Sequence, residues 1–124
     1  MIFENTYKDT VKFNLYLKGE RTDMTYTLKN PESEEMKSLK RSYENKATKS
    51  KSDNETAGIG RAYMRDRFIK SIVAWENFKE KNESGEVVDM TCSDDNKAKL
   101  FDEPKYALVV DSITRDMEDR DTFF

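Results

Sequence analysis

The alternation of apolar and polar residues predicts a β-hairpin near the start of the chain. Over residues 11–17 the apolar residues occupy every second position, and residues 24–28 repeat the pattern. A period of two indicates half-buried strands, because successive side chains point to opposite faces of a sheet. The polar, glycine-containing segment 18–23 predicts the loop between them. A hairpin is only marginally stable alone, so its apolar face requires a packing partner.

A surface helix is predicted to follow the hairpin. Asn30 is placed to cap it and Pro31 to occupy its first helical position. Its apolar residues form one narrow stripe, which consists of Met36, Leu39 and Tyr43. Residues 44–60 then become polar, with only two alanines and one isoleucine that are apolar. This composition predicts a flexible polar loop or a frayed helix end.

The strongest helical pattern covers residues 61–78 and predicts the core helix. Its main stripe, at helical spacing, consists of Met64, Phe68, Ile72 and Trp75. The polar segment 79–86 predicts a turn, and the pair Val87-Val88 predicts a short extended segment.

Two further helices are predicted near the C-terminus. Either Thr91 or Ser93 is placed to cap a helix over 94–102, because both precede acidic residues. The last helix is predicted to start near Pro104, with a stripe that consists of Tyr106, Val110, Ile113 and Met117. A charged tail is predicted at about 117–124.

These elements predict a single α+β domain over residues 1–124, a length that suits one hydrophobic core. An N-terminal antiparallel β-hairpin packs on a small bundle of three to four helices, and the fold is mostly helical. The predicted structural core consists of Phe13, Leu15, Phe68, Ile72, Trp75, Val110 and Ile113.

Charge and composition narrow the range of functions. The net charge of −3 divides unevenly: residues 1–52 carry 11 basic and 8 acidic residues, and residues 53–124 carry 11 and 17. This balance argues against a nucleic-acid partner. No apolar run approaches the roughly 18 residues of a membrane span, so we expect no membrane partner. No signal peptide is visible and Cys92 is the only cysteine, which fits a reducing intracellular compartment.

The sequence offers no candidate catalytic, cofactor-binding or metal-binding residue. Histidine, the commonest general base and metal ligand, is absent. Cys92 has no basic neighbour in the sequence that would activate its thiol. A calcium loop counted from Asp89 would hold Asp94 and Leu100 where glycine and glutamate are required. We therefore expect a non-enzymatic protein without a cofactor.

The terminal pair Phe123 and Phe124 follows a run of charged residues and is the candidate partner-binding site. Apolar residues at an exposed end often dock onto another molecule. The alternative interpretation is that both rings fold back onto the protein's own core.

Five short segments occur in a fixed order in the C-terminal half. The first is an aliphatic pair before tryptophan (Ile72–Trp75), and the second is an acidic turn with a glycine (Asn82–Gly85). A short apolar segment follows (Val87–Met90), then a turn that runs from polar residues to leucine (Thr91–Phe101). The last is an acidic pair followed by proline (Asp102–Pro104). Over about residues 64–113 this order resembles the C-terminal half of the tail assembly chaperones of long-tailed bacteriophages. The family often has a proline in the segment that is Val88–Thr91 here, and this chain has none.

The resemblance implies a tail assembly chaperone in the host cell cytoplasm, absent from the mature virion. Such proteins bind the long helical tape measure protein and help to recruit tail tube protein subunits. We also expect a homo-oligomer, because one small domain covers little of a long client. Two alternatives stay open: a structural phage tail or head–tail joining protein, and a small host-directed regulator that binds one protein.

Overall fold

The computed structural model describes all residues from 1 to 124, and its centre is a three-stranded antiparallel sheet. The strands lie in chain order: β1 (Thr10–Leu17), β2 (Glu20–Lys29) and β3 (Ile72–Glu76). Lys18 and Gly19 form the two-residue turn between β1 and β2, with φ of 51° and 80°. Two positive φ values match the twist of a hairpin. The predicted hairpin is confirmed, and its loop is shorter than predicted.

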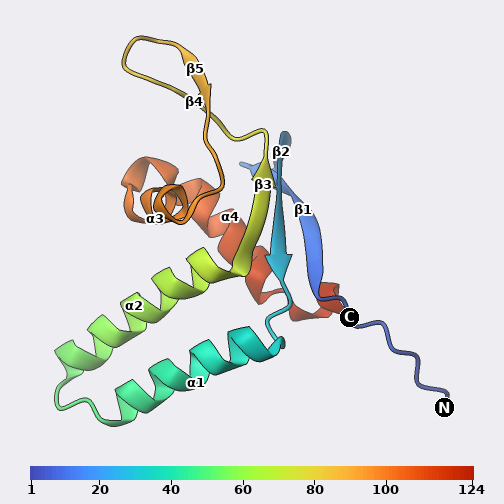
Figure 1. Ribbon diagram of the computed structural model, residues 1–124, viewed down its shortest axis with the longest axis vertical. Helices are drawn as coiled ribbons and strands as arrows, with labels where there is room; N and C mark the ends of the chain where they lie inside the picture. The colour runs from blue at the N-terminus through green and yellow to red at the C-terminus, as the bar shows by residue number, and fades with distance from the viewer.

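Helices make up 50% of the residues and strands 23%, which confirms a mostly helical α+β fold. The helices are α1 (Glu34–Thr48), α2 (Asp53–Ser71), α3 (Asp94–Asp102) and α4 (Ala107–Glu118). Figure 1 shows α4 crossing one face of the sheet, with the pair α1 and α2 at one end of the sheet. A second hairpin projects from the other end, formed by β4 (Lys79–Lys81) and β5 (Val87–Asp89).

One hydrophobic cluster lies between the sheet, α4 and the ends of α2 and α3. Its 14 buried members are Leu15, Met24, Tyr26, Leu28, Phe68, Ile72, Trp75, Phe78, Met90, Leu100, Tyr106, Ile113, Met117 and Phe123. Five of the seven predicted core residues are among them. The other two, Phe13 and Val110, are only partly buried against the cluster.

The predicted helix over 61–78 is wrong at its C-terminal end. Helix α2 ends at Ser71, and the chain continues as β3. Ile72 pairs with Leu28 and Trp75 pairs with Tyr26 of the neighbouring strand. β-Branched and aromatic residues suit a half-buried strand, and the open edge of β2 offers backbone partners. Tertiary pairing therefore overrides the helical spacing.

The predicted loop over 44–60 is also wrong, because most of this segment is helical. Helix α1 continues to Thr48, and α2 begins at Asp53, where the hydroxyl of Ser52 accepts a hydrogen bond from the Glu55 amide. The two helices pack against each other, and the rings of Tyr43 and Tyr63 lie 5.5 Å apart. Capping and this contact stabilise helices that composition alone did not indicate.

Three predicted helix starts have different outcomes. Asn30 does not cap α1, because Ser33 does, and the side-chain nitrogen of Asn30 instead donates to the carbonyl of Lys8 at 3.0 Å. Ser33 lies directly before two acidic residues, which favour the helix N-terminus. Of the two candidate caps of α3, Ser93 is the one that caps it and Thr91 is not. The prediction that Pro104 opens the last helical segment is confirmed, since Pro104–Tyr106 forms a 3₁₀ turn leading into α4.

Candidate protein-binding surface

The segment between β3 and α3 is fixed to the core by Trp75. Its indole nitrogen donates to the carbonyl of Met90 at 2.7 Å, and its ring lies 5.5 Å from that of Phe78. Cys92 is partly buried beside this contact, and its burial raises the pKa of the thiol. A raised pKa keeps the thiol protonated, which is the state expected of a structural cysteine.

The projecting hairpin is attached to the helices through Glu80. Its carboxylate accepts hydrogen bonds from Lys105 at 2.8 Å, from Lys99 at 3.4 Å and from the hydroxyl of Tyr106. Hydrogen bonds from Lys105 and Tyr106 lower the pKa of Glu80 to about 2. Burial and the same contact raise the pKa of Tyr106 to about 12. Both groups therefore keep their ordinary neutral-pH charge states.

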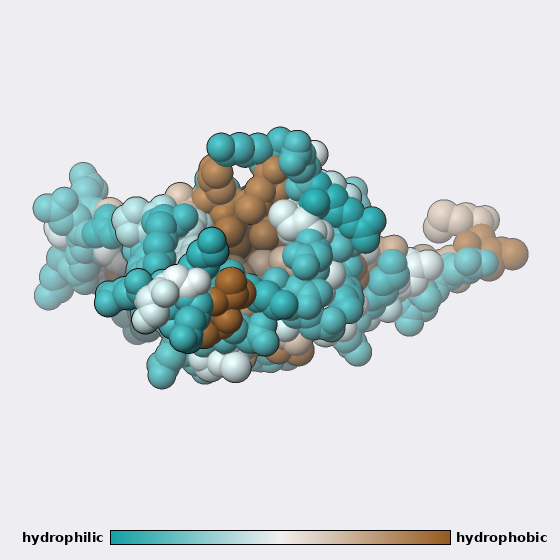
Figure 2. All heavy atoms as spheres, turned by 90° about the horizontal axis from the view of Figure 1, so that it is seen from above, coloured by the Kyte–Doolittle hydropathy of each residue, from teal (hydrophilic) through white to brown (hydrophobic).

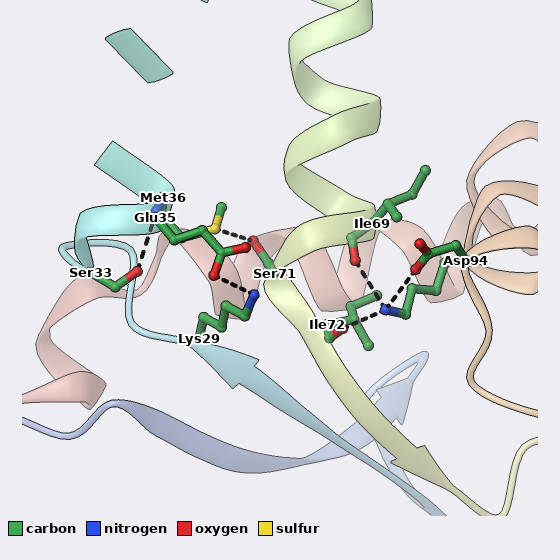
Figure 3. A network of polar contacts seen from close by, with 9 residues as sticks. Lys29, Ser33, Glu35, Met36, Ile69, Ser71, Ile72 and Asp94 are labelled. Carbon is green, nitrogen blue, oxygen red and sulfur yellow. Dashed lines mark hydrogen bonds and ion pairs between the residues drawn. The ribbon is translucent and has the colours of Figure 1, made fainter. Parts of the chain in front are cut away.

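The largest hollow, of about 640 Å³, lies where α2 meets β3 and α3, and its lining is mostly charged. Lys97 is buried there and donates to the carbonyls of Ile69 and Ile72 and to the carboxylate of Asp94. Figure 3 shows these three acceptors converging on one ammonium group. An ammonium has three donors, so all are used, and Lys97 ties the last turn of α2 and the first residue of β3 to α3.

The structure separates the two residues of the predicted partner-binding site. Phe123 is fully buried, packs 5.8 Å from the ring of Phe13, and accepts a hydrogen bond at its carbonyl from the Lys8 amide. The partner role proposed for Phe123 is therefore wrong, and the tail is a 3₁₀ turn that closes the core. Phe124 is 45% exposed and contacts the ring of Tyr7.

An apolar groove runs between α2 and the start of α4, and we call it the helix groove. It encloses about 270 Å³. Its apolar lining comes from three helices and the proline turn: Met64, Phe101, Pro104, Ala107 and Val110. Met64 is 47% exposed, although its spacing predicts a core position. Methionine adapts its shape to different partners, which makes it frequent on protein-binding surfaces.

The rim of the helix groove is acidic. Asp102, Glu103 and Asp111 line it, and no lysine or arginine does. Arg65 pairs with Asp102 and Lys105 pairs with Glu103, whereas Asp111 belongs to no ion pair. A groove that combines an apolar lining with the unpaired carboxylate of Asp111 is complementary to an amphipathic helix that carries a basic residue beside its apolar stripe.

Comparison of the chain with protein-family models, with curated proteins and with solved structures gives no match. No helix combines the length and apolar character that crossing a bilayer requires. The structure also holds no group of three or more cysteine or acidic side chains arranged to bind a metal ion.

The sequence placed Val110 in the predicted core and Met64 on the apolar stripe of the predicted core helix, and so did not indicate the helix groove. Both residues do lie on the apolar stripes of their helices, but the hydrophobic cluster covers only part of each stripe. No local signal distinguishes these two positions from the buried members of the same stripes, because all of them are apolar residues at helical spacing.

Proposed function

We propose that this chain is a tail assembly chaperone of a long-tailed bacteriophage and acts by binding, not by catalysis. It holds helical segments of the tape measure protein in the helix groove and helps to recruit tail tube protein subunits. It works as a homo-oligomer in the host cell cytoplasm and leaves before the virion is complete.

The observation that carries this proposal is the exposed, acid-rimmed apolar groove between two helices. Fully burying an apolar side chain contributes roughly 1.5–3 kcal/mol, and a few such contacts stabilise a reversible complex. A client helix would cover Met64 and the exposed part of Val110, and its basic residues would face Asp111. The resemblance over residues 64–113 supports the same proposal, because the segment contains every residue of the groove except Thr114.

Co-expression with the tape measure protein from the same genome tests the proposal. The wild-type chain is expected to keep the client in the soluble fraction and to co-purify with it. The double variant Met64→Ser/Val110→Ser is expected to lose both effects. Leu108→Ser is the matched control, because Leu108 also lies on α4 and is 54% exposed but does not line the groove.

Mass spectrometry of purified virions separates the proposal from a structural role. A chaperone is expected to be absent from the particles, whereas stoichiometric incorporation would contradict the proposal. Unchanged client solubility with the wild-type chain would also contradict it, and capture of a host protein in place of the client would favour a host-directed regulator.

A further inference from the structure

The N-terminal arm, residues 1–9, carries an exposed apolar cluster. Ile2 is 91% exposed and Phe3 is 82% exposed, and Met1 precedes them. Figure 1 shows the arm leaving the body at the end of the sheet where α1 begins. The arm is fixed at its base, because the Lys8 amide donates to the carbonyl of Phe123 and the Asn30 amide donates to the carbonyl of Asp9.

An apolar hollow lies at the opposite end of the sheet, and we call it the sheet-end hollow. It encloses about 290 Å³. Its apolar lining comes from β1, β2, the start of the second hairpin and the region around the start of α4: Leu15, Leu17, Met24, Phe78, Tyr106 and Val109. Figure 2 looks onto this end of the molecule and shows apolar side chains gathered in a hollow.

The apolar cluster of the arm cannot be seated as a whole in the hollow of its own chain. From the fixed Lys8 the backbone spans at most about 18 Å to Phe3 and about 25 Å to Met1. From Lys8 an extended strand covers about 23 Å to Leu15, at the near edge of the hollow, and about 30 Å to Leu17. Only the tip of a fully extended arm reaches that edge, so an arm seated with all three apolar residues in the sheet-end hollow belongs to another molecule.

We propose that Met1, Ile2 and Phe3 of one copy bind in the sheet-end hollow of a second copy. The hollow is also lined by Lys79, and the arm places Glu4 directly after its apolar cluster. Neither Lys79 nor Glu4 belongs to an ion pair within one chain. Glu4 of one copy and Lys79 of the other form an ion pair across the contact. Asp23 also lines the hollow and repels a carboxylate, so it disfavours an arm shifted to place Glu4 beside it.

This contact is head-to-tail, because each copy presents an arm at one end and a hollow at the other. Such heterologous contacts extend into rings or open filaments and do not stop at a two-fold dimer. The inference gives a geometry to the self-association proposed above. It is independent of client binding, since the helix groove and the sheet-end hollow share no residue.

Sedimentation velocity of the purified full chain, without any client, tests the inference. The wild type is expected to form species larger than a dimer as its concentration rises. Ile2→Ser/Phe3→Ser removes the arm contact and Val109→Glu blocks the hollow, and each variant alone is expected to be monomeric. An equimolar mixture of the two is expected to form a heterodimer and nothing larger, because one intact arm and one intact hollow remain.

A charge swap supplies a second test that does not disturb packing. Lys79→Glu and Glu4→Lys are each expected to raise the dissociation constant for self-association about tenfold, and the double variant is expected to restore it. Circular dichroism checks that every variant is folded. Val73→Ser is the control, since Val73 is 47% exposed and lines neither end of the contact.

A wild type that stays monomeric at every accessible concentration would overturn the inference. Assembly of the Ile2→Ser/Phe3→Ser variant to wild-type size would also overturn it. A Lys79→Glu/Glu4→Lys double variant that self-associates as weakly as the single variants would overturn it as well. If the arm and hollow variants no longer self-associate but still bind the client, the proposal that the client binds in the helix groove still stands. The two proposals can therefore fail separately.

Discussion

Helices α2 and α4 each carry apolar residues that end in opposite environments. Phe68 and Ile113 are fully buried in the core, whereas Met64 and Val110, one turn away on the same helices, line the helix groove and stay exposed or partly exposed. The residues are chemically alike, so the difference lies in what covers them. Phe68 and Ile113 lie inside the hydrophobic cluster, whereas Val110 is only partly covered by it and Met64 is 47% exposed.

This difference separates residues that hold the fold from residues that are free to bind. A buried ring contributes to stability in the isolated chain, whereas an exposed apolar residue gains that contribution only when a partner covers it. Substitutions in the two regions are therefore expected to have opposite profiles, with large effects on stability in the core and large effects on binding in the groove.

The largest effect on stability is expected from the core residue at the end of the chain. Phe123→Ala is expected to lower the free energy of unfolding by about 3–5 kcal/mol, because it empties a fully buried site. Urea denaturation followed by circular dichroism measures it. Phe124→Ala is the matched control, with an expected loss below about 1 kcal/mol. Equal effects of the two substitutions would contradict the placement of Phe123 in the core.

A smaller loss is expected where a charged group supports the end of α2. Lys97→Met keeps the length of the side chain but leaves the carbonyls of Ile69 and Ile72 without their donor. The expected cost is about 1–3 kcal/mol in the same denaturation measurement. Lys99→Met removes only a half-exposed ion pair to Glu80, and less than about 1 kcal/mol is expected.

A pH-dependent change is expected at the attachment of the second hairpin. The pKa of Glu80 is about 2 in the folded protein, below the value of about 4.3 in an unfolded chain. Its contribution is therefore complete above about pH 4.3 and is lost as the pH falls towards about 2. Glu80→Gln is expected to flatten this part of the curve of unfolding free energy against pH. If the unfolding free energy of Glu80→Gln falls with decreasing pH as steeply as that of the wild type, the ion pairs of Glu80 do not stabilise the attachment of the second hairpin.

The smallest effect on stability is expected in the helix groove. Met64→Ser is expected to change the free energy of unfolding by less than about 1 kcal/mol, because the side chain is already 47% exposed. The same substitution is expected to weaken client binding. A loss of stability as large as that of the Phe123 variant would make Met64 a core residue and remove the distinction between the two regions.

The parts of the fold that local signals specify could be predicted from the sequence. Alternation gave the first hairpin, and Ser93 and Pro104 marked the starts of two helical segments, because caps and turns depend on neighbouring residues. The end of α2 could not be predicted in this way. Phe68, Ile72 and Trp75 fit helical spacing, and only the open edge of β2 decides that the last two belong to a strand.

The helix groove could not be predicted, because a sequence shows which residues are apolar but not which of them the fold covers. The polar composition of residues 44–60, which span the end of α1 and the start of α2, misled for a related reason. These helices are held by the cap at Ser52, a local signal that the polar composition masked, and by contact between α1 and α2, which no local signal reveals.

Hydrogen–deuterium exchange of the chain with and without a tape measure segment tests the central claim most directly. Binding is expected to slow exchange in peptides around Met64 and from Phe101 to Asp111, and to leave the sheet and the second hairpin unchanged. Protection confined to other parts of the molecule, or no protection at saturating client, would contradict the assignment of the helix groove as the client-binding surface.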